Sequence, residues 1–345
     1  MRRVLPPIFA LILLTAACGA TDEPPGAGPS ALAIAATASS PPAAPASSSQ
    51  APGAVVADTT PPANGEPATT AAPVPAFPVS TAGVEITKRP ERIVSLSSTT
   101  TEILFAIGAG DQVVAVDSFS DYPAEAPITE LNAFEPNVEA ISTYEPDLVI
   151  FFLEPGALGS GLTALGIPVI HHVAALGLDD VYAQITDLGA ATGNVSGASQ
   201  LIEGLRTSIA DVAGRFGSVA EPLTYYHEVD DTYYSATSAT FIGSIYSLFG
   251  LTSIADAADD IGSGFPQLSP EYIIEADPDI IFYGCAEWCG TTPESIAERP
   301  GWGSLSAVES GALVAIDDDL TSRWGPRLAQ FVETVGMSLE TLFVE

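Results

Sequence analysis

Short apolar runs alternate with longer stretches of mixed polarity after residue 85, and this pattern predicts an α/β fold. Continuous apolar runs are typical of strands buried on both faces of a parallel sheet. Ser and Thr before the mixed stretches and Gly after them are typical helix ends. The predicted strands lie at residues 92–96, 113–116, 148–152, 168–171, 223–229 and 313–316.

Two segments of the chain repeat one another at a spacing of 132 residues (271 minus 139). The first segment runs from Asn137 to Phe152 and the second from Ser269 to Phe282. The matched pairs are Glu139 with Glu271, Pro146 with Pro278 and Asp147 with Asp279. Each copy predicts a short helix, a turn at the Pro, which cannot continue a helix, and a buried strand. The chain is therefore predicted to form two similar α/β lobes.

The segment 178–216 differs from both halves, because its pattern is mostly helical and contains no strand candidate. A break is predicted near Gly193-Asn194, and the last helix of the chain is predicted from about Pro326. A long helix between two α/β halves would act as a strut. We therefore expect an N-terminal lobe at residues 85–193, an interlobe helix at 194–218 and a C-terminal lobe at 219–345.

The first eighteen residues predict export. Arg2 and Arg3 precede an apolar stretch, 4–14, that is too short to span a bilayer, and small residues follow it. This segment, 1–18, resembles a bacterial lipoprotein signal with its lipobox, although Thr15 stands where the lipobox usually has Leu. Cys18 is then the expected lipidated first residue of the mature chain. Ordinary secretion with an unmodified Cys18 is the alternative.

Residues 19–84 consist largely of Ala, Pro, Thr, Ser and Gly, with few aromatic residues. Such a segment cannot bury enough apolar surface to offset the loss of chain entropy on folding. We expect a disordered tether between the anchor and the folded lobes.

The charge and the cysteine content of the chain limit the kinds of partner and site that it can have. Ten Lys and Arg face 43 Asp and Glu, a net charge of −33, which argues against nucleic acid and anionic lipid surfaces. With Cys18 lipidated, Cys285 and Cys289 remain, and outside the cell two thiols this close predict a disulfide. A metal site from this pair is disfavoured, because no third Cys or nearby His completes a tetrahedron.

Several motifs occur in a fixed order along the lobes. They are Arg92-Ile-Val-Ser-Leu-Ser, Thr101-Glu-Ile-Leu-Phe-Ala-Ile-Gly-Ala-Gly-Asp, Ser120-Asp-Tyr-Pro, Glu145-Pro-Asp-Leu-Val, Thr240-Phe-Ile-Gly and Arg299-Pro-Gly-Trp. Over nearly all of residues 90–340 the chain resembles the iron-siderophore/vitamin B12 class of ABC-transporter substrate-binding proteins, and it is most similar to the vitamin B12-binding branch. Ser98 departs from the family, which often has Pro there.

The resemblance implies two three-layer α/β sandwiches with mainly parallel sheets, joined by one long rigid helix, with the ligand in the cleft between them. It implies an extracytoplasmic, membrane-anchored monomer that captures cobalamin or a related corrinoid and delivers it to an ABC permease and its ATPase. A ferric siderophore or haem is the alternative ligand. Siderophore sites usually add basic residues that grip anionic chelates, and this chain has few.

Carried over position by position, the resemblance implies six ligand contacts. They are Tyr122, Phe134, Phe152, Tyr234, Phe265 and Asp319. Five aromatic rings favour a large flat ligand, because rings offer much apolar area at little entropic cost. Each position also has a structural interpretation: Phe152 as core, Tyr122 as a loop anchor, and Asp319 as part of an acidic loop with Asp317 and Asp318.

Glu139 and Glu271 match the acidic pair through which the family docks on arginines of its permease. A pseudo-two-fold protein can meet a two-fold transporter with two like carboxylates. The alternative is a charge that only favours a helix dipole. For His171, His172 and His227 we expect structural roles, because side chains of adjacent strand residues point to opposite faces and the first two cannot share one site.

Other classes of function lack the residues they need. There is no Gly-x-Ser-x-Gly, no His-Glu-x-x-His and no phosphate loop, so we expect no enzyme. A divalent-metal-binding lipoprotein would need several His in both lobes, and the chain has three. An adhesin would explain the tether and the acidity, but neither the repeated lobes nor the aromatic positions.

Overall fold

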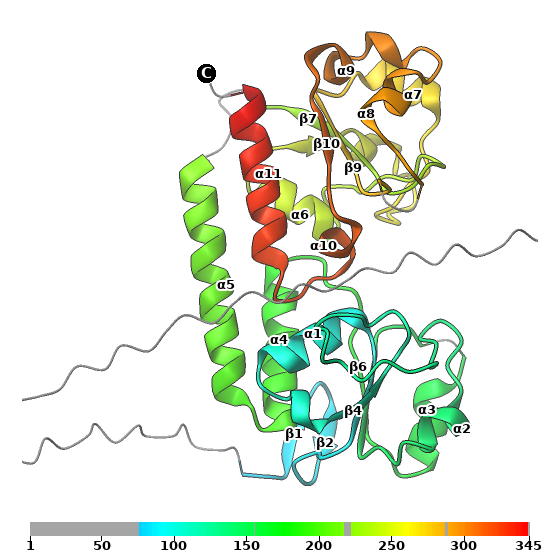
Figure 1. Cartoon of the computed structure of the whole chain (residues 1–345), viewed down its shortest axis with the longest axis vertical. Coiled ribbons are helices and arrows are strands. Elements are labelled where there is room, and N and C mark those ends of the chain that lie inside the picture. The colour runs from blue at the N-terminus through cyan, green and yellow to red at the C-terminus, as the bar shows by residue number, and fades with distance from the viewer. Residues whose placement is uncertain (1–75, 155, 217–221, 287–288, 344–345) are drawn as a thin grey trace, which may run out of the picture. The chain divides into compact units, whose positions relative to one another are not determined.

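The computed structural model of the chain describes residues 76–154, 156–216, 222–286 and 289–343. Two α/β lobes lie beside a layer of long helices, as Figure 1 shows. Cys18, the signal segment and residues 19–75 of the expected tether lie outside the described residues.

The N-terminal lobe contains a four-stranded parallel sheet. Its strands are β3 (Ile93–Leu96), β4 (Val113–Val116), β5 (Leu148–Phe151) and β6 (Val169–His171), in the order β4-β3-β5-β6. Its helices are α1 (Ser98–Ala106), the short η1 (Gly110–Gln112), α2 (Val138–Ser142) and α3 (Leu158–Ala164). Every residue of β3 and β5 is buried, as the continuous apolar runs predicted.

The C-terminal lobe repeats this arrangement. Its parallel strands are β7 (Thr224–Glu228), β8 (Thr252–Ser253), β9 (Ile280–Tyr283) and β10 (Leu313–Ala315), in the order β10-β9-β7-β8. Its helices are α6 (Phe241–Ser247), η2 (Ile254–Ala258), α7 (Pro270–Ala276), α8 (Pro293–Ala297), η3 (Trp302–Ser304), α9 (Ser306–Ser310) and α10 (Asp318–Ser322). In both sheets the first strand lies between the second and the third, so the prediction of two similar α/β lobes is confirmed.

The repeated Asp residues explain why the sequence repeats. Asp147 accepts hydrogen bonds from the backbone N–H groups of Glu91 and Arg92, at 3.1 and 2.9 Å, just before β3 begins. Asp279 accepts one from the backbone N–H of Thr224, at 2.7 Å, where β7 begins. In each lobe the carboxylate therefore ties the turn after the repeated helix to the first strand of the sheet.

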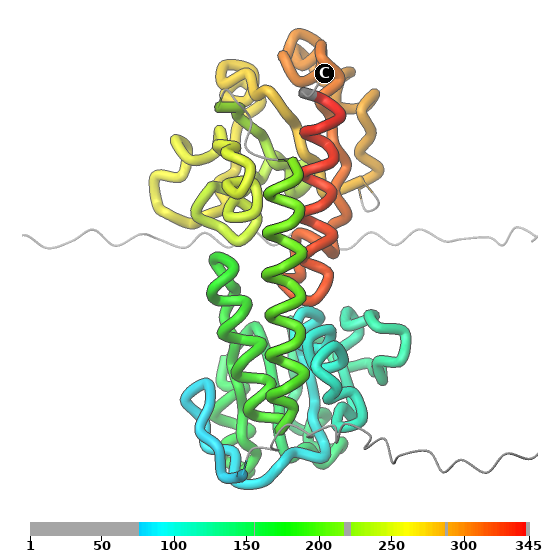
Figure 2. Tube along the Cα trace, turned by 90° about the vertical axis from the view of Figure 1, so that its left-hand side faces the viewer, coloured from blue at the N-terminus to red at the C-terminus, as the bar shows by residue number. Residues whose placement is uncertain are grey.

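Three long helices lie beside the lobes, and one of them runs from one lobe to the other. They are α4 (Leu178–Thr192), α5 (Val195–Phe216) and α11 (Leu328–Phe343). Helix α5 packs against α4 of the N-terminal lobe and α11 of the C-terminal lobe, and Figure 2 shows it running along both. Gly193 ends α4 in the left-handed conformation (φ 77°), which Gly adopts without strain. A side chain at Gly189 would collide with Ala198, so α4 and α5 approach closely. No helix of the described part is long and apolar enough to cross a membrane.

A hairpin precedes the first lobe and corrects one expected boundary. Strands β1 (Val79–Thr81) and β2 (Val84–Ile86) pair antiparallel, and the hairpin packs on α4. The Thr81 hydroxyl donates a hydrogen bond to Asp187 at 2.7 Å. The expected tether, 19–84, therefore ends too late, because residues 79–84 belong to this paired hairpin, in which Val79 and Val84 are partly buried against the core.

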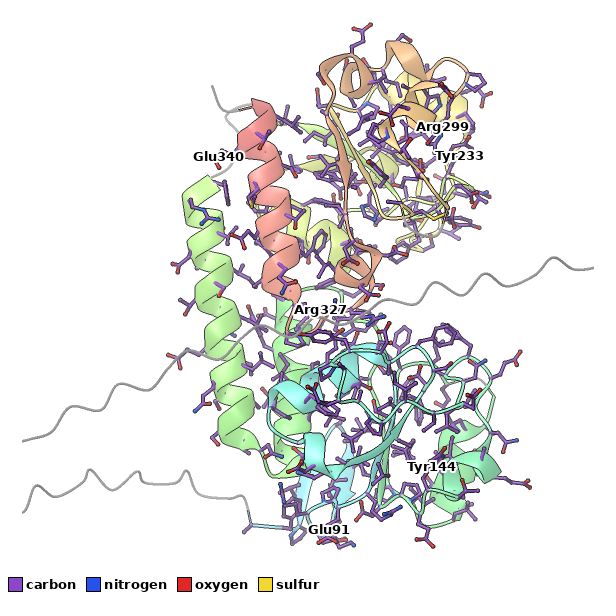
Figure 3. The ribbon with its side chains drawn as sticks, viewed as in Figure 1. Glu91, Tyr144, Tyr233, Arg299, Arg327 and Glu340 are labelled. Atoms are coloured by element: carbon purple, nitrogen blue, oxygen red, sulfur yellow. A yellow bond between two sulfur atoms is a disulfide. The ribbon has the colours of Figure 1, made fainter. Side chains whose placement is uncertain are left out.

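The motif Arg299-Pro-Gly-Trp has a structural role in the C-terminal lobe. Arg299 Nη2 donates a hydrogen bond to Glu228 at 2.8 Å, and Glu228 is fully buried at the end of β7. The Arg299 guanidinium also lies 4.6 Å from the ring centre of Trp302 and 5.5 Å from that of Tyr233. Figure 3 shows Arg299 and Tyr233 together in this lobe. The motif therefore neutralises a buried carboxylate, which unpaired would be strongly destabilising.

Candidate ligand-binding cleft

Two neighbouring cavities lie where the lobes face each other. The C-lobe cavity, about 420 Å³, extends from the 174–176 loop to β7, α6 and the 259–265 loop. The N-lobe cavity, about 410 Å³, lies between the start of α1, the loops at 117–119 and 133–134, the end of β5, and α10. Asp318, Ser322 and Trp324 line both cavities. The two spaces therefore form one cleft, divided by α10 and the residues after it.

Three phenylalanines line the N-lobe cavity. Phe119 and Phe134 pack edge to face, with ring centres 5.2 Å apart, and are 47% and 58% exposed. Phe152 follows β5, and its ring meets Trp324 edge-on at 5.4 Å. Phe134 and Phe152 are predicted contacts, whereas sequence reasoning missed Phe119. Exposed rings at a concave site offer apolar area to a ligand without refolding.

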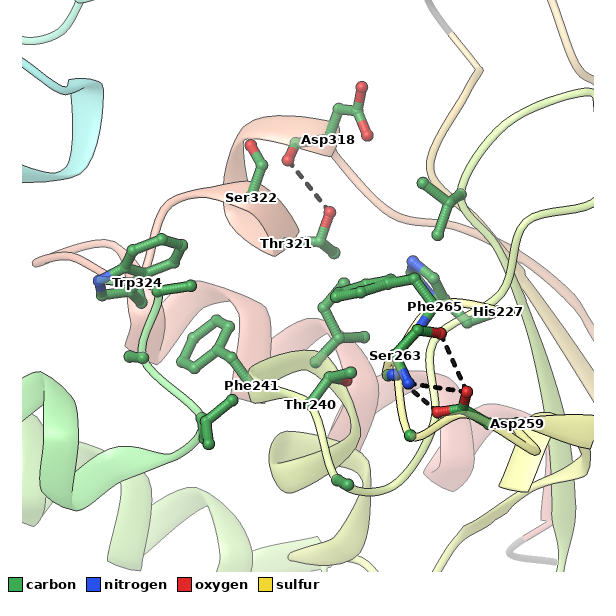
Figure 4. Close-up of a pocket in the computed structure, with 18 residues that line it drawn as sticks. His227, Thr240, Phe241, Asp259, Ser263, Phe265, Asp318, Thr321, Ser322 and Trp324 are labelled. Atoms are coloured by element: carbon green, nitrogen blue, oxygen red, sulfur yellow. Dashed lines mark hydrogen bonds between the residues drawn. The ribbon is translucent and has the colours of Figure 1, made fainter. Parts of the chain in front are cut away.

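The C-lobe cavity is more apolar, and local hydrogen bonds fix its walls (Figure 4). Asp259 accepts hydrogen bonds from the backbone N–H groups of Ser263, at 2.8 Å, and Gly264, at 2.6 Å. This turn holds the predicted contact Phe265, which is 44% exposed. Trp324 donates its indole N–H to Gln184 of α4 at 2.9 Å, so its ring is fixed between the cavities. Trp324 was missed, because it follows no motif at the sequence level.

Two predicted contacts lie apart from these cavities. Tyr122 is 45% exposed and lies under the guanidinium of Arg327, 4.6 Å from its ring centre. Tyr234 is 40% exposed and pairs with Gln267 in an isolated β-bridge. Neither residue lines either cavity as described. Their motifs indicated the residue type but not where each residue lies relative to the cavities.

An ion cluster joins the lobes at the floor of the cleft. Glu102 of α1 is buried. Its two carboxylate oxygens accept hydrogen bonds from Arg327, from Nη2 at 2.6 Å and from Nε at 3.0 Å. Arg323 lies 2.8 Å from Asp121, 2.7 Å from Asp319 and 3.4 Å from Glu102. Figure 3 shows Arg327 at the junction between the lobes. Sequence reasoning missed the arginines, although a lone Glu in an apolar helix signals a buried partner.

The ion pairs of this cluster determine which charged groups of the cleft remain available to a ligand. Within the described residues, Arg323 is the one Arg or Lys that lines the cavities, and three carboxylates surround it. The predicted contact Asp319 is 3.3 Å from Arg327 as well, so its charge is also compensated. Asp117 lines the N-lobe cavity; burial raises its pKa, and hydrogen bonds from Ser120 and the Phe119 N–H oppose this. The cleft therefore offers rings and carboxylates but no uncompensated cation.

One of the three histidines lines the cleft. His227 Nδ1 lies 2.9 Å from the Tyr246 hydroxyl, and burial lowers the pKa of His227 to about 4. His171 Nε2 contacts the Phe152 carbonyl oxygen at 3.0 Å, whereas His172 is buried 3.7 Å from Asp187. In the described part of the chain, no group of three or more His, Cys, Asp or Glu could hold a metal ion.

The remaining predicted residues lie outside the cleft. Glu139 and Glu271 are both exposed, in the first turns of α2 and α7, after the N-caps Asn137 and Ser269. They thus occupy equivalent helices of the two lobes. Cys285 and Cys289 form a disulfide in the loop that follows β9.

Comparisons with known proteins agree with this architecture. The sequence profile of the periplasmic binding protein family matches residues 93–320. An uncharacterized ABC transporter substrate-binding lipoprotein of Bacillus subtilis is 29% identical over 278 residues, 77% of this chain and 85% of that protein. A cobalamin-binding protein of Halobacterium salinarum is 30% identical over 271 residues, 74% of this chain and 72% of that protein.

Solved structures with the same fold carry different ligand names. The periplasmic vitamin B12 binding protein of Vibrio cholerae has a TM-score of 0.62 at 26% identity, over 74% of this chain and 98% of that one. A periplasmic haem-binding protein of Roseiflexus has a TM-score of 0.63 at 26% identity, over 73% of this chain and 99% of that one. The fold alone does not choose the ligand, so the choice depends on the chemistry of the cleft.

Proposed function

Because the chain belongs to the periplasmic binding protein family, we propose that it captures cobalamin or a related corrinoid in the cleft and delivers it to an ABC permease. The family consists of solute-binding proteins, and the proposal adds the ligand and the absence of chemical turnover. The cobalamin-binding relative from Halobacterium salinarum supports the choice of ligand. The charge and lining of the cleft support it independently.

The observation that carries the proposal is an aromatic cleft whose arginine is already neutralised. Haem propionates and the acidic groups of many ferric siderophores would need a free cation to offset their desolvation. Arg323 cannot serve them without leaving Asp121 and Asp319. A corrinoid carries mostly neutral amides around a flat ring, which suits Phe134, Phe152 and Phe265.

The division of the cleft into two adjoining cavities also suits a ligand that is large enough to extend into both. Each cavity is within the size range of small-molecule sites, about 300–1,000 Å³. Because Trp324 and Ser322 line both, one ligand can occupy both spaces while touching this shared wall. The hydroxyl group of Ser322, which lines both cavities, can form a hydrogen bond with an amide side chain of the ligand.

Haem or a ferric siderophore is the second candidate ligand, and the haem-binding neighbour from Roseiflexus favours it. That ligand would require the ion cluster to open, so that Arg323 or Arg327 could reach an anionic group. Because breaking these ion pairs costs free energy, we expect haem or a ferric siderophore to bind more weakly here than in a cleft with a free cation.

Calorimetry of the full chain against cyanocobalamin, haem and a ferric hydroxamate tests the proposal. We expect saturable 1:1 binding of cyanocobalamin, recovery of the ligand unchanged, and at least tenfold weaker binding of the two iron chelates. Saturable binding of an iron chelate with no heat from cyanocobalamin would transfer the function to the second candidate.

We extend the proposal to the transport cycle. Cys18 would hold the protein at the outer face of the cell membrane through its lipid, with the lobes free to reach the permease and its ATPase. The relative from Bacillus subtilis, named as a lipoprotein, supports this location. Glu139 and Glu271 would dock the two lobes on the permease, since both are exposed on equivalent helices. One monomer would serve one permease.

A further inference from the structure

The wall of the C-lobe cavity contains one imidazole. His227 lies near the carboxyl end of β7, the end at which parallel strands of α/β sheets present ligand sites. Only 1% of its surface is exposed, yet it lines the cavity, and Figure 4 shows it beside Phe265. No other His, and no Cys or Met, lines either cavity among the described residues. His227 is therefore the soft nitrogen donor of the cleft.

A buried hydroxyl group holds this ring. The Tyr246 hydroxyl lies 2.9 Å from Nδ1, and Tyr246 itself stacks on Phe282 with ring centres 4.5 Å apart. Burial lowers the pKa of His227 to about 4, so the imidazole is neutral near pH 7. When Nδ1 donates its proton to the Tyr246 oxygen, Nε2 keeps a lone pair. Metal-binding histidines are commonly oriented in this way by a partner of the second nitrogen.

We infer that His227 coordinates, through Nε2, the cobalt of a corrinoid whose lower axial position is open. This inference rests on the proposed function. The Nε2 lone pair forms the Co–N bond, and a water molecule leaves the cobalt. Cobalt keeps its oxidation state, and no proton or electron is transferred. One face of the macrocycle would then lie toward the C-lobe cavity and the other toward Phe134 and Phe152.

Other groups of the same cavity make coordination a better role for His227 than hydrogen bonding to the ligand. The Ser322 hydroxyl already lines the wall and can bond to a corrin amide, whereas Thr240 and Thr321 donate their hydroxyls to the backbone carbonyl oxygens of Thr237 and Asp318. An imidazole adds what hydroxyls lack, a nitrogen donor for a transition metal. The expected ligand class is a base-free corrinoid, such as cobinamide, or a cobalamin whose own base has dissociated.

Absorbance titration of the full chain tests this. Diaquacobinamide has two exchangeable water ligands, whereas dicyanocobinamide in excess cyanide has none. We expect both to bind, and only diaquacobinamide to change its corrin spectrum to that of a nitrogen-ligated cobalt. Binding of diaquacobinamide with an unchanged spectrum overturns the inference and leaves the proposed function standing. Failure of both corrinoids and of cyanocobalamin to bind rejects the proposed function itself.

Variants assign the spectral change to one residue. His227→Gln should abolish it and weaken diaquacobinamide at least about tenfold more than dicyanocobinamide. Tyr246→Phe removes the partner of Nδ1 and should weaken the same ligand less. His171→Gln, outside both cavities, is the matched control and should retain the change. A His227→Gln protein that still shifts the spectrum contradicts the assignment; if that variant does not fold, the wild-type comparison of the two cobinamides decides.

Discussion

At the level of single side chains, a sequence motif predicts the type of residue at a position but not whether that residue lines the cleft. Phe134, Phe152 and Phe265 line the two cavities, whereas Tyr122, which lies against the Arg327 guanidinium, and Tyr234, which pairs with Gln267, line neither. All five came from the same kind of sequence argument. The difference lies in where each residue stands relative to the cavities, which depends on how distant parts of the chain pack.

Alanine substitutions therefore separate the two groups of aromatic residues. We expect Phe134→Ala and Phe265→Ala each to weaken corrinoid binding about tenfold, near 1.4 kcal/mol, because each removes a ring that the ligand buries. Tyr234→Ala should change the affinity less than threefold. Leu165→Ala, as exposed as Phe134 and outside both cavities, is the control for general effects. Calorimetry measures all four, and a larger loss at Tyr234 than at Phe265 would reverse the structural assignment.

We expect His172 to make the stability of the protein depend on pH. Burial, the main cause, lowers its pKa, while Asp187 at 3.7 Å opposes this and neither ring nitrogen has a hydrogen bond within the described residues. Above the unfolded value of about 6.5 both states are neutral and the pH has no effect. As the pH falls below it, the unfolded chain takes up the proton first, and stability decreases until the pH passes below the folded pKa.

Urea denaturation at several pH values measures this dependence. His172→Gln should lose less stability than wild type between pH 7 and 4.5, by up to about 1.4 kcal/mol for each unit by which the pKa is lowered. His227, with a pKa of about 4, contributes to both proteins and cancels in the difference. Parallel curves for the two proteins would show that His172 is not the titrating group.

Equivalent elements in the two lobes carry equivalent charges. Helices α2 and α7 each begin with a side-chain cap and present one exposed Glu in the first turn. The charge also favours the helix dipole, but that effect alone requires no symmetry. The docking role is supported by the equivalent positions of Glu139 and Glu271 in the two lobes.

Charge reversal at both helices tests the docking role. Glu139→Lys with Glu271→Lys should leave corrinoid affinity within about threefold and weaken permease association by at least about 2 kcal/mol, the lower end for losing one partner of a charge pair at an interface. Each single reversal should weaken association less. Glu309→Lys, an exposed Glu in the first turn of α9, is the matched control. Normal uptake by the double variant in a dependent host would remove these residues from the docking surface.

The ion cluster connects elements that are distant in sequence. Glu102 belongs to α1, whereas Arg323 and Arg327 follow α10, 221 and 225 residues later. Removing the carboxylate would leave two guanidinium groups short of a partner in a place where they are mostly buried. Breaking a buried pair in this way is strongly destabilising.

Glu102→Gln should therefore lower the free energy of unfolding by about 3 kcal/mol. Arg215→Gln, which breaks the exposed pair with Glu333 at 3.1 Å, is the control and should change stability by less than about 1 kcal/mol. Urea denaturation compares both with wild type. An equal effect of the two substitutions would mean that the cluster contributes no more than a surface pair.

For the molecule as a whole, the proposed lipid anchor at Cys18 can be tested apart from the lobes. Cys18→Ser should move the protein from the membrane to the soluble fraction, because several acyl chains are needed for firm anchoring. Its corrinoid affinity should stay unchanged, since the cleft is built from residues after 95. Fractionation with calorimetry on the released protein measures both. A wild-type protein already found in the soluble fraction would contradict the anchor.

The sequence by itself determined the two-lobed α/β architecture, because strand and helix periods are local and the repeat at Asp147 and Asp279 marks the same structural unit in both lobes. It also determined which positions carry aromatic rings. It placed the end of the tether too late, since the 79–86 hairpin is too short to stand out by its pattern.

Only the tertiary structure decided the character of the cleft. It brought Phe119 and Trp324 beside the predicted rings, neutralised Arg323, and turned His227 toward a cavity. These encounters join residues up to 225 positions apart, as between Glu102 and Arg327. Local periodicity reports which face of an element is buried, whereas the partner of each buried or cleft-facing group depends on how the two lobes pack against α4, α5 and α11.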